Sequence, residues 1–105
     1  MPGNRFAKRK DGTQAEIEKA LRDAGYVVLD TSWAGRGLMD VMAGSACNPP
    51  LTLLVECKSP GGKMSPAELK THATFPGNWI IADSGACAVT QAMEIRAQHL
   101  AGRSE

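Results

Sequence analysis

The stretch Gly37-Leu38-Met39-Asp40-Val41-Met42-Ala43, followed after a short connection by Leu51-Thr52-Leu53-Leu54-Val55-Glu56-Cys57-Lys58, indicates the fold. The two apolar runs are separated by a connection that contains Asn48-Pro49-Pro50 and favours a turn, so the pattern predicts paired strands, with residues 30–37 as the loop that leads to the first of the pair. Charged residues interrupt both runs, although a buried strand disfavours them. Because successive side chains of a strand alternate between its faces, Glu56 and Lys58 point to one side and Cys57 to the other.

These charged residues predict a cation site at the ends of the two strands. If Asp40 lies on the same face as Glu56 and Lys58, two carboxylates and one ammonium group converge. Carboxylate oxygens are the ligands that a hard divalent cation prefers, and the lysine is then left to position a water molecule or to neutralise a phosphate. A purely structural alternative is also consistent with the pattern. In that alternative Asp40 forms a turn at the strand end, while Glu56 and Lys58 form an ion pair.

The length of 105 residues, of which 43% are hydrophobic, predicts one globular domain with its own core. No apolar run is long enough to cross a membrane, and no apolar segment of a signal peptide follows the basic N-terminus, so we expect a cytoplasmic protein of a bacterium or a phage-infected cell. The three cysteines, Cys47, Cys57 and Cys87, form no Cys-x-x-Cys pair and are expected to be reduced thiols. A zinc site that combines them with His72 or His99 lacks the usual ligand spacing.

The formal net charge of +1 is unevenly distributed along the chain. Residues 1–12 contain glycine, proline and positive charge without periodicity, which predicts a flexible basic tail before a single domain over 13–105. Such a tail is suited to a polyanion such as a nucleic acid, and a solvated tail is the alternative. The cations concerned are Arg5, Lys8, Arg9 and Lys10.

Capping signals predict two helices around the strand pair. Thr13-Gln14-Ala15-Glu16 has the form of a capping box and is followed by an apolar stripe at helical spacing, with Gly25 as the stop. A second helix is predicted from Ser65 as N-cap and Pro66 as first helical residue to the region of Phe75. The stripe of the first helix consists of Ile17, Ala20, Leu21 and Ala24.

The remaining elements predict a mixed α/β sheet. Residues 26–29 and 79–82 read as further strands, and residues 89–100 read as a last helix whose core face contains Val89, Met93, Ala97 and Leu100. The expected order is therefore αβββαβα. A helix between the third and fourth strands makes them parallel neighbours, whereas the first three strands form an antiparallel meander.

The motifs Gly37-Leu38-Met39-Asp40, Val55-Glu56-Cys57-Lys58 and Met64-Ser65-Pro66-Ala67-Glu68 together resemble those of the PD-(D/E)xK nuclease superfamily. Within that superfamily the chain is similar to the small stand-alone virus-type replication-repair nuclease domains (VRR-NUC) of phages and prophages. The similarity runs from about Thr13 to the last helix. Met39 stands where the family usually has proline, and Glu68 stands where it usually has glutamine. The resemblance implies a restriction-endonuclease-like core with a mixed central sheet flanked by helices.

The resemblance implies a set of site residues. The residues on catalytic motif positions are Glu16, Asp40, Glu56, Lys58 and Glu68. The implied metal ligands are Asp40, Glu56, Glu16 and the backbone carbonyl of Cys57, for Mg²⁺ with Mn²⁺ as a substitute. The expected nucleic-acid contacts are Lys8, Arg9, Lys10, Arg36, Gly37, Lys63 and His72.

Several of these residues have an ordinary structural alternative. Glu16 and Glu68 are both capping residues by position, His72 has the features of a surface histidine, and Arg36 and Gly37 fit an ordinary loop. Lys58 beside two acids is expected to keep its proton, which makes it a group that orients water and stabilises charge rather than a free base.

The function that the resemblance implies is metal-dependent hydrolysis of DNA, with 5′-phosphate and 3′-hydroxyl products. A chain of this size covers little more than one scissile phosphate, so we expect a homodimer that cuts branched DNA, as Holliday junction resolvases do. The biological setting would be phage or prophage replication, repair or recombination. Two alternatives remain open: a non-catalytic nucleic-acid-binding module with a nuclease-like fold, and a restriction-type endonuclease that reads a short sequence.

Overall fold

A computed structural model describes residues 12–35 and 37–102 of the chain. The elements follow the predicted order αβββαβα, with a short 3-10 helix after the first strand. In chain order they are α1 (Gly12–Asp23), β1 (Val27–Asp30), η2 (Ser32–Ala34), β2 (Val41–Ser45), β3 (Leu51–Cys57), α2 (Pro66–Thr74), β4 (Asn78–Ala82) and α3 (Gly85–Gly102).

The four strands form one mixed sheet in the order β1-β2-β3-β4. β1 pairs with β2 and β2 with β3 in antiparallel fashion, whereas β3 and β4 are parallel. The crossover through α2 explains the parallel pair, because a chain that leaves the end of β3 must return to the opposite end before it can start β4. The predicted meander and crossover are therefore confirmed, as is a mixed α/β fold with flanking helices.

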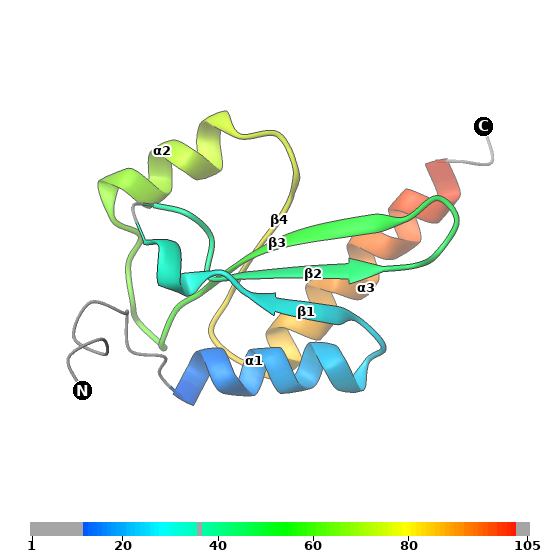
Figure 1. Ribbon diagram of the computed structural model, residues 1–105, viewed down its shortest axis with the longest axis horizontal. Helices are drawn as coiled ribbons and strands as arrows, with labels where there is room; N and C mark the ends of the chain where they lie inside the picture. Colours follow the sequence, from blue (N-terminus) through cyan, green and yellow to red (C-terminus); the bar gives the residue numbers. More distant parts are fainter. Residues whose placement is uncertain (1–11, 36, 103–105) are drawn as a thin grey trace.

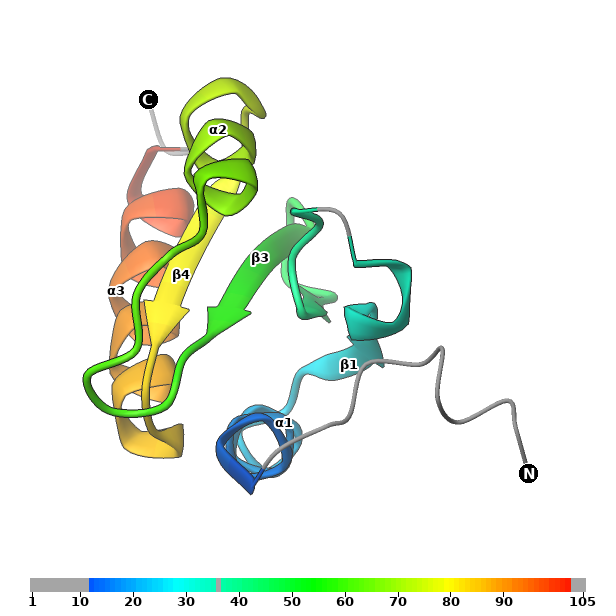
Figure 2. The ribbon, with the colours of Figure 1, turned by 90° about the vertical axis from the view of Figure 1, so that its left-hand side faces the viewer.

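The hydrophobic core lies between the sheet and the helix pair α1 and α3 (Figures 1 and 2). Ile17 and Leu21 of α1 pack there with alternate residues of β3, namely Leu51, Leu53 and Val55. Helix α2 lies beside the other face of the sheet, and each of its residues is at least partly exposed. Leu54 and Glu56 therefore lie on the face of β3 that is directed toward α2.

Strand β2 begins at Val41, so Asp40, which was expected within the strand, immediately precedes it. The structure also corrects two predictions for α3. Helix α3 begins at Gly85 rather than Val89, since the Ser84 hydroxyl accepts a hydrogen bond from the Cys87 amide and caps the helix. The predicted core face of α3 is only partly correct: Val89 packs against the core, but Ala88 and Ala92 are the fully buried residues and Met93 is 65% exposed.

The start of α1 also differs from the prediction. Thr13 lies inside the helix, which begins at Gly12, so Thr13 is not its N-cap. The end of the helix is as expected: Gly25 has φ +99°, and the Gly25 and Tyr26 amides donate to the carbonyls of Arg22 and Leu21.

Cys47, Cys57 and Cys87, which all lie in the described part of the chain, are free cysteines. Within residues 12–35 and 37–102, no helix combines the length and hydropathy that crossing a membrane requires.

Candidate active site

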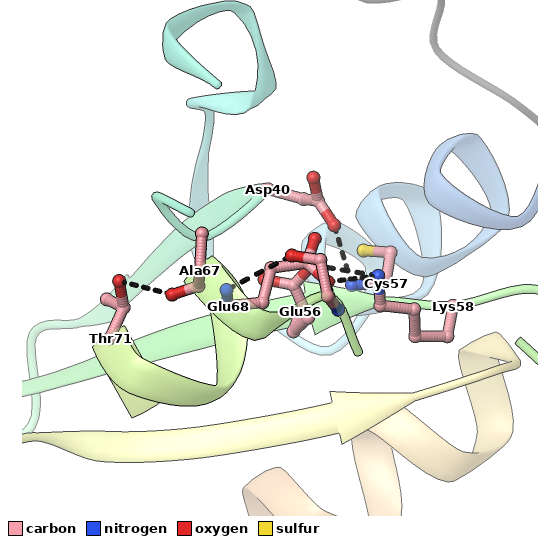
Figure 3. Close-up of polar contacts among 8 residues, drawn as sticks. Asp40, Glu56, Cys57, Lys58, Ala67, Glu68 and Thr71 are labelled. Carbon is pink, nitrogen blue, oxygen red and sulfur yellow. Dashed lines mark hydrogen bonds and ion pairs between the residues drawn. The ribbon is translucent and has the colours of Figure 1, made fainter. Parts of the chain in front are cut away.

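Four charged side chains meet where β2 begins and β3 ends (Figure 3). Asp40 immediately precedes β2, and because Val41 pairs with Val55, Asp40 lies opposite Glu56. The side chain of Glu56 points away from the core with that of Lys58, whereas Cys57 packs against the core. The alternation predicted for this strand end is thus confirmed. The first turn of α2 supplies Glu68, the fourth charged residue.

The two carboxylates from the strands are deeply buried. Asp40 is 3% and Glu56 is 1% exposed. The backbone of Asp40 is fixed on β3, because its amide donates to the Val55 carbonyl at 3.1 Å. Its Oδ2 atom accepts a hydrogen bond of 2.9 Å from the Cys57 amide. These contacts direct the Asp40 carboxylate toward the end of β3, next to Glu56.

Lys58 bridges two acids of the site. Its Nζ atom donates a hydrogen bond of 2.6 Å to Glu68 Oε1 and lies 3.5 Å from Glu56 Oε2. Burial disfavours the ammonium ion, but the hydrogen bond and charge of Glu68, together with the charge of Glu56, raise the pKa of Lys58 above its ordinary value. Lys58 is therefore protonated at neutral pH, as expected from the sequence.

Glu68 has two roles in the structure. It completes the predicted capping box, since its amide donates to Ser65 Oγ at 3.1 Å and its Oε1 accepts from the Ser65 amide at 2.8 Å. The same carboxylate also holds Lys58. Burial raises the pKa of a carboxyl group, but the bonds from Lys58 and from the Ser65 amide outweigh it and lower the pKa of Glu68 to about 2.

Glu56 is the electrostatically unfavourable member of the group. Burial, followed by the proximity of Glu68 and Asp40, raises the pKa of Glu56 to about 8. Its Oε2 atom is fully buried and accepts no hydrogen bond from the described residues, because Lys58 at 3.5 Å forms only an ion-pair contact with it. A buried carboxylate oxygen beside further carboxylates requires either a proton or a cation.

The side chains of the site can bind a hard divalent cation only if a backbone oxygen supplies a further ligand. Among the described residues, no group of three or more histidine, cysteine, aspartate or glutamate side chains is arranged to hold a metal ion. Asp40 and Glu56 supply two carboxylates, and the resemblance assigns the Cys57 carbonyl, which directly follows Glu56 in the sequence, as the third oxygen ligand. The buried Glu56 oxygen that lacks a hydrogen bond is the feature that favours a cation here.

Glu16 contacts the start of α3. Its Oε2 atom accepts a hydrogen bond of 2.8 Å from the amide of Gly85, the first residue of α3. The two helices are in close contact there, since a Cβ atom on Gly85 would lie 2.8 Å from the Cβ of Ala20. Glu16 therefore links α1 to the positive end of α3, an arrangement that stabilises a helix N-terminus.

A buried polar network on α1 was missed by the sequence reasoning. Gln14 Nε2 donates to Glu18 Oε2 at 2.8 Å and to Asp30 Oδ1 at 3.0 Å, at the end of β1. Gln14 and Glu18 are 4% and 2% exposed, so the buried acid of α1 is Glu18 and not Glu16. The sequence feature that indicates this contact is the spacing of four residues between Gln14 and Glu18, which places both side chains on one face of a helix.

The three predicted nucleic-acid contacts within the described residues lie on or beside α2. Gly37 packs against the first turn of α2, where an added Cβ would lie 2.8 Å from the Ala67 carbonyl oxygen. The ring of His72 lies 5.0 Å from that of Trp79. Lys63 is exposed before α2. The other four predicted contacts, Lys8, Arg9, Lys10 and Arg36, lie outside the described residues.

No family model, curated protein or solved structure matches the chain.

Proposed function

We propose that this chain is a metal-dependent endonuclease of the PD-(D/E)xK type, with a restriction-endonuclease-like core and Mg²⁺ as its cofactor. The observation that carries the proposal is the pair of buried carboxylates of Asp40 and Glu56, with a Glu56 oxygen that accepts no hydrogen bond from the described residues. Asp40 and Glu56 are the residues that the resemblance assigns to a metal, and they lie opposite each other at the end of a strand pair.

Asp40, Glu56 and the Cys57 carbonyl would hold the cation. When bound, Mg²⁺ or Mn²⁺ would polarise a phosphodiester and make water a stronger nucleophile at neutral pH. Lys58 remains an ammonium ion, so it donates hydrogen bonds and does not abstract a proton. Its place beside Glu56 suits it to orient a water molecule and to stabilise the negative charge that develops on the phosphate oxygens.

Glu68 keeps the lysine in place between substrates. Its hydrogen bond to Lys58 Nζ directs the ammonium group toward the carboxylates before any phosphate is present. A phosphate oxygen would compete with Glu68 for the same donor, which has further hydrogens available for both partners. Glu68 stands where the family usually has glutamine. Its negative charge therefore holds Lys58 more firmly in one orientation, but it also repels the phosphates of DNA.

The preferred substrate, by resemblance, is branched or junction DNA, cut by a homodimer in phage or prophage replication, repair or recombination. A second copy supplies the second active site that a two-strand cut requires, because one chain of 105 residues has one such cluster among its described residues. Cytoplasmic localisation follows from the same proposal, since the substrate is intracellular DNA.

A non-catalytic DNA-binding module is the competing function. It is favoured by one observation: the Lys58 ammonium group is already hydrogen-bonded to Glu68, as in a structural ion pair. A structural pair explains Lys58 and Glu68, but it leaves the buried Glu56 carboxyl group to be satisfied by a proton alone. The nuclease explains both features.

The test compares cleavage of labelled four-way junction, flap and linear duplex DNA in Mg²⁺ or Mn²⁺. Wild type, Glu56→Gln and Lys58→Ala are assayed beside Glu94→Gln and Lys19→Ala, which remove one acid and one lysine from exposed positions on α3 and α1. The nuclease predicts metal-dependent cutting that is lost in the first two variants and kept in the controls. DNA binding without cutting by wild type would establish the binding module instead, and cutting at fixed sequence positions would establish the restriction-type enzyme.

A further inference from the structure

The geometry points to Thr31 as a positioning residue that orients the Asp40 carboxylate for cation binding. The inference rests on the proposed function, because it concerns how tightly the carboxylate pair holds its cation. Thr31 lies in the segment between β1 and η2 and does not belong to the motifs from which the site was predicted.

Thr31 contacts the two residues that immediately precede β2 through two separate hydrogen bonds. Its hydroxyl donates to the Met39 carbonyl at 2.7 Å, and its amide donates to the Asp40 carbonyl at 2.9 Å. On the other side, the Asp40 amide donates to the Val55 carbonyl at 3.1 Å. The peptide groups on both sides of the Asp40 Cα atom are therefore held by neighbouring segments.

This fixation matters because Asp40 precedes the first residue of β2 and follows a loop. Gly37, three residues earlier, has a positive φ, so a regular strand does not continue through this segment. An aspartate side chain has only two rotatable bonds, so its carboxylate position follows directly from the direction of its Cα–Cβ bond. The Thr31 contacts set that direction, and the hydrogen bond from the Cys57 amide then sets the carboxylate next to Glu56.

Thr31 is itself held by its neighbours. Asp30 Oδ1 accepts hydrogen bonds from the Ser32 amide at 2.9 Å and the Ser32 hydroxyl at 2.6 Å, and these contacts close the turn around Thr31. The same oxygen accepts from Gln14 Nε2 at 3.0 Å, and Gln14 is buried on α1. The chain of contacts thus runs from the core helix to the Asp30 turn, from that turn to Thr31, and from Thr31 to the Asp40 backbone.

The hydroxyl of Thr31 can be removed without changing the shape of the side chain. Thr31→Val keeps a branched side chain of similar size and the backbone hydrogen bond to Asp40, and it loses only the bond to Met39. Thr31→Ser keeps the hydroxyl. Groups that orient metal ligands change metal affinity about 10- to 100-fold when they are removed. Because one of the two Thr31 bonds remains, we expect a loss near the lower end of this range.

The control is Thr74→Val on α2. It removes a hydrogen bond of the same kind and length, from Thr74 Oγ1 to the Lys70 carbonyl at 2.7 Å, at the far end of the helix from Glu68. Asp40→Asn serves as a second reference, because it removes the proposed ligand charge itself. Together the two variants separate a general loss of one hydrogen bond from a loss at the site.

The experiment measures Mg²⁺ and Mn²⁺ binding to the DNA-free protein by titration calorimetry, together with the thermal midpoint in EDTA. We expect Thr31→Val to weaken binding about tenfold. Thr31→Ser should remain within threefold of wild type, Thr74→Val should bind as wild type does, and Asp40→Asn should lose binding. If Thr31→Val does not fold, Thr31→Ala against Thr31→Ser repeats the comparison with and without the hydroxyl.

Two outcomes would overturn the role of Thr31 and leave the nuclease proposal intact. One is wild-type cation affinity in Thr31→Val while Asp40→Asn loses binding. The other is an equal loss in Thr31→Val and Thr31→Ser, since the hydroxyl would then not be the cause. Failure of the proposed function has a different result: wild type and Asp40→Asn would bind neither cation, and wild type would cut no DNA.

Discussion

Lys58 Nζ and Glu68 Oε1 are 2.6 Å apart, although the two residues belong to different elements of the fold. The same Glu68 oxygen also caps α2 through the Ser65 amide. The orientation of the lysine is therefore coupled to the first turn of the helix, and a change in Glu68 affects both.

Replacement of Glu68 should separate its capping role from its charge. Glu68→Gln keeps an oxygen that can accept from the Ser65 amide, whereas Glu68→Ala removes it. We expect Glu68→Ala to lower the free energy of unfolding by about 1 kcal/mol, the usual cost of a lost capping interaction, and Glu68→Gln to lower it by about half as much. Urea denaturation measures both values. Equal losses in the two variants would show that the charge, not the cap, is the stabilising feature.

The raised pKa of Glu56 should make the metal-free protein less stable at alkaline pH. A carboxyl group with a folded-state pKa of about 8, against an ordinary value of 4.5, stabilises the folded protein fully only below pH 4.5. That contribution is lost as pH rises through 8. The lowered pKa of Glu68 has its effect at more acidic pH. Its contribution to stability is lost as pH falls from 4.5 toward 2. Urea unfolding of wild type in EDTA should therefore show a falling free energy between pH 5 and pH 8.

Glu56→Gln is the variant that tests this assignment, because a neutral amide cannot titrate. The decline with pH should be largely absent in Glu56→Gln and unchanged in Glu94→Gln, whose side chain is exposed on α3. Parallel pH profiles for wild type and Glu56→Gln would assign the decline to another group.

Gly37→Ala should destabilise the protein more than Gly61→Ala. Both glycines have φ +81°, so each substitution carries the cost of a left-handed backbone, about 1–2 kcal/mol. An added Cβ at Gly61 meets nothing within 4 Å, whereas at Gly37 it would lie 2.8 Å from the Ala67 carbonyl oxygen. We expect urea denaturation to give an additional loss of about 1–3 kcal/mol at Gly37, the range for overpacked positions. Equal losses would mean that the loop moves away from α2 at little cost.

Glu16→Ala should reduce stability without weakening cation binding. Its carboxylate bonds the first amide of α3, and loss of such an interaction costs about 1 kcal/mol. Urea denaturation and Mg²⁺ titration are the two measurements, with the exposed Glu94→Ala as control. A tenfold loss of Mg²⁺ affinity with unchanged stability would instead place Glu16 among the metal ligands, as the resemblance implied.

Features that depend on neighbours in the sequence were predicted well. The alternation of Val55, Glu56 and Cys57 between two faces follows from strand geometry, and the cap formed by Ser65 and Glu68 spans only three residues. The strand order followed from the lengths of the connections, since only the link between β3 and β4 has room for a crossover. These properties are set by backbone geometry over a few residues, so the sequence by itself determined them.

The partners of the polar side chains were decided by the tertiary structure. The sequence marked Glu16 as a capping or site residue, but its carboxylate bonds Gly85, which is 69 positions away. Thr31 belongs to no recognised motif, yet it forms hydrogen bonds to the backbone around Asp40 because β1 and β2 are adjacent. The pKa of Glu56 likewise depends on burial and on carboxylates from other elements. Such contacts arise only when the helices pack on the sheet, so no local pattern in the chain encodes them.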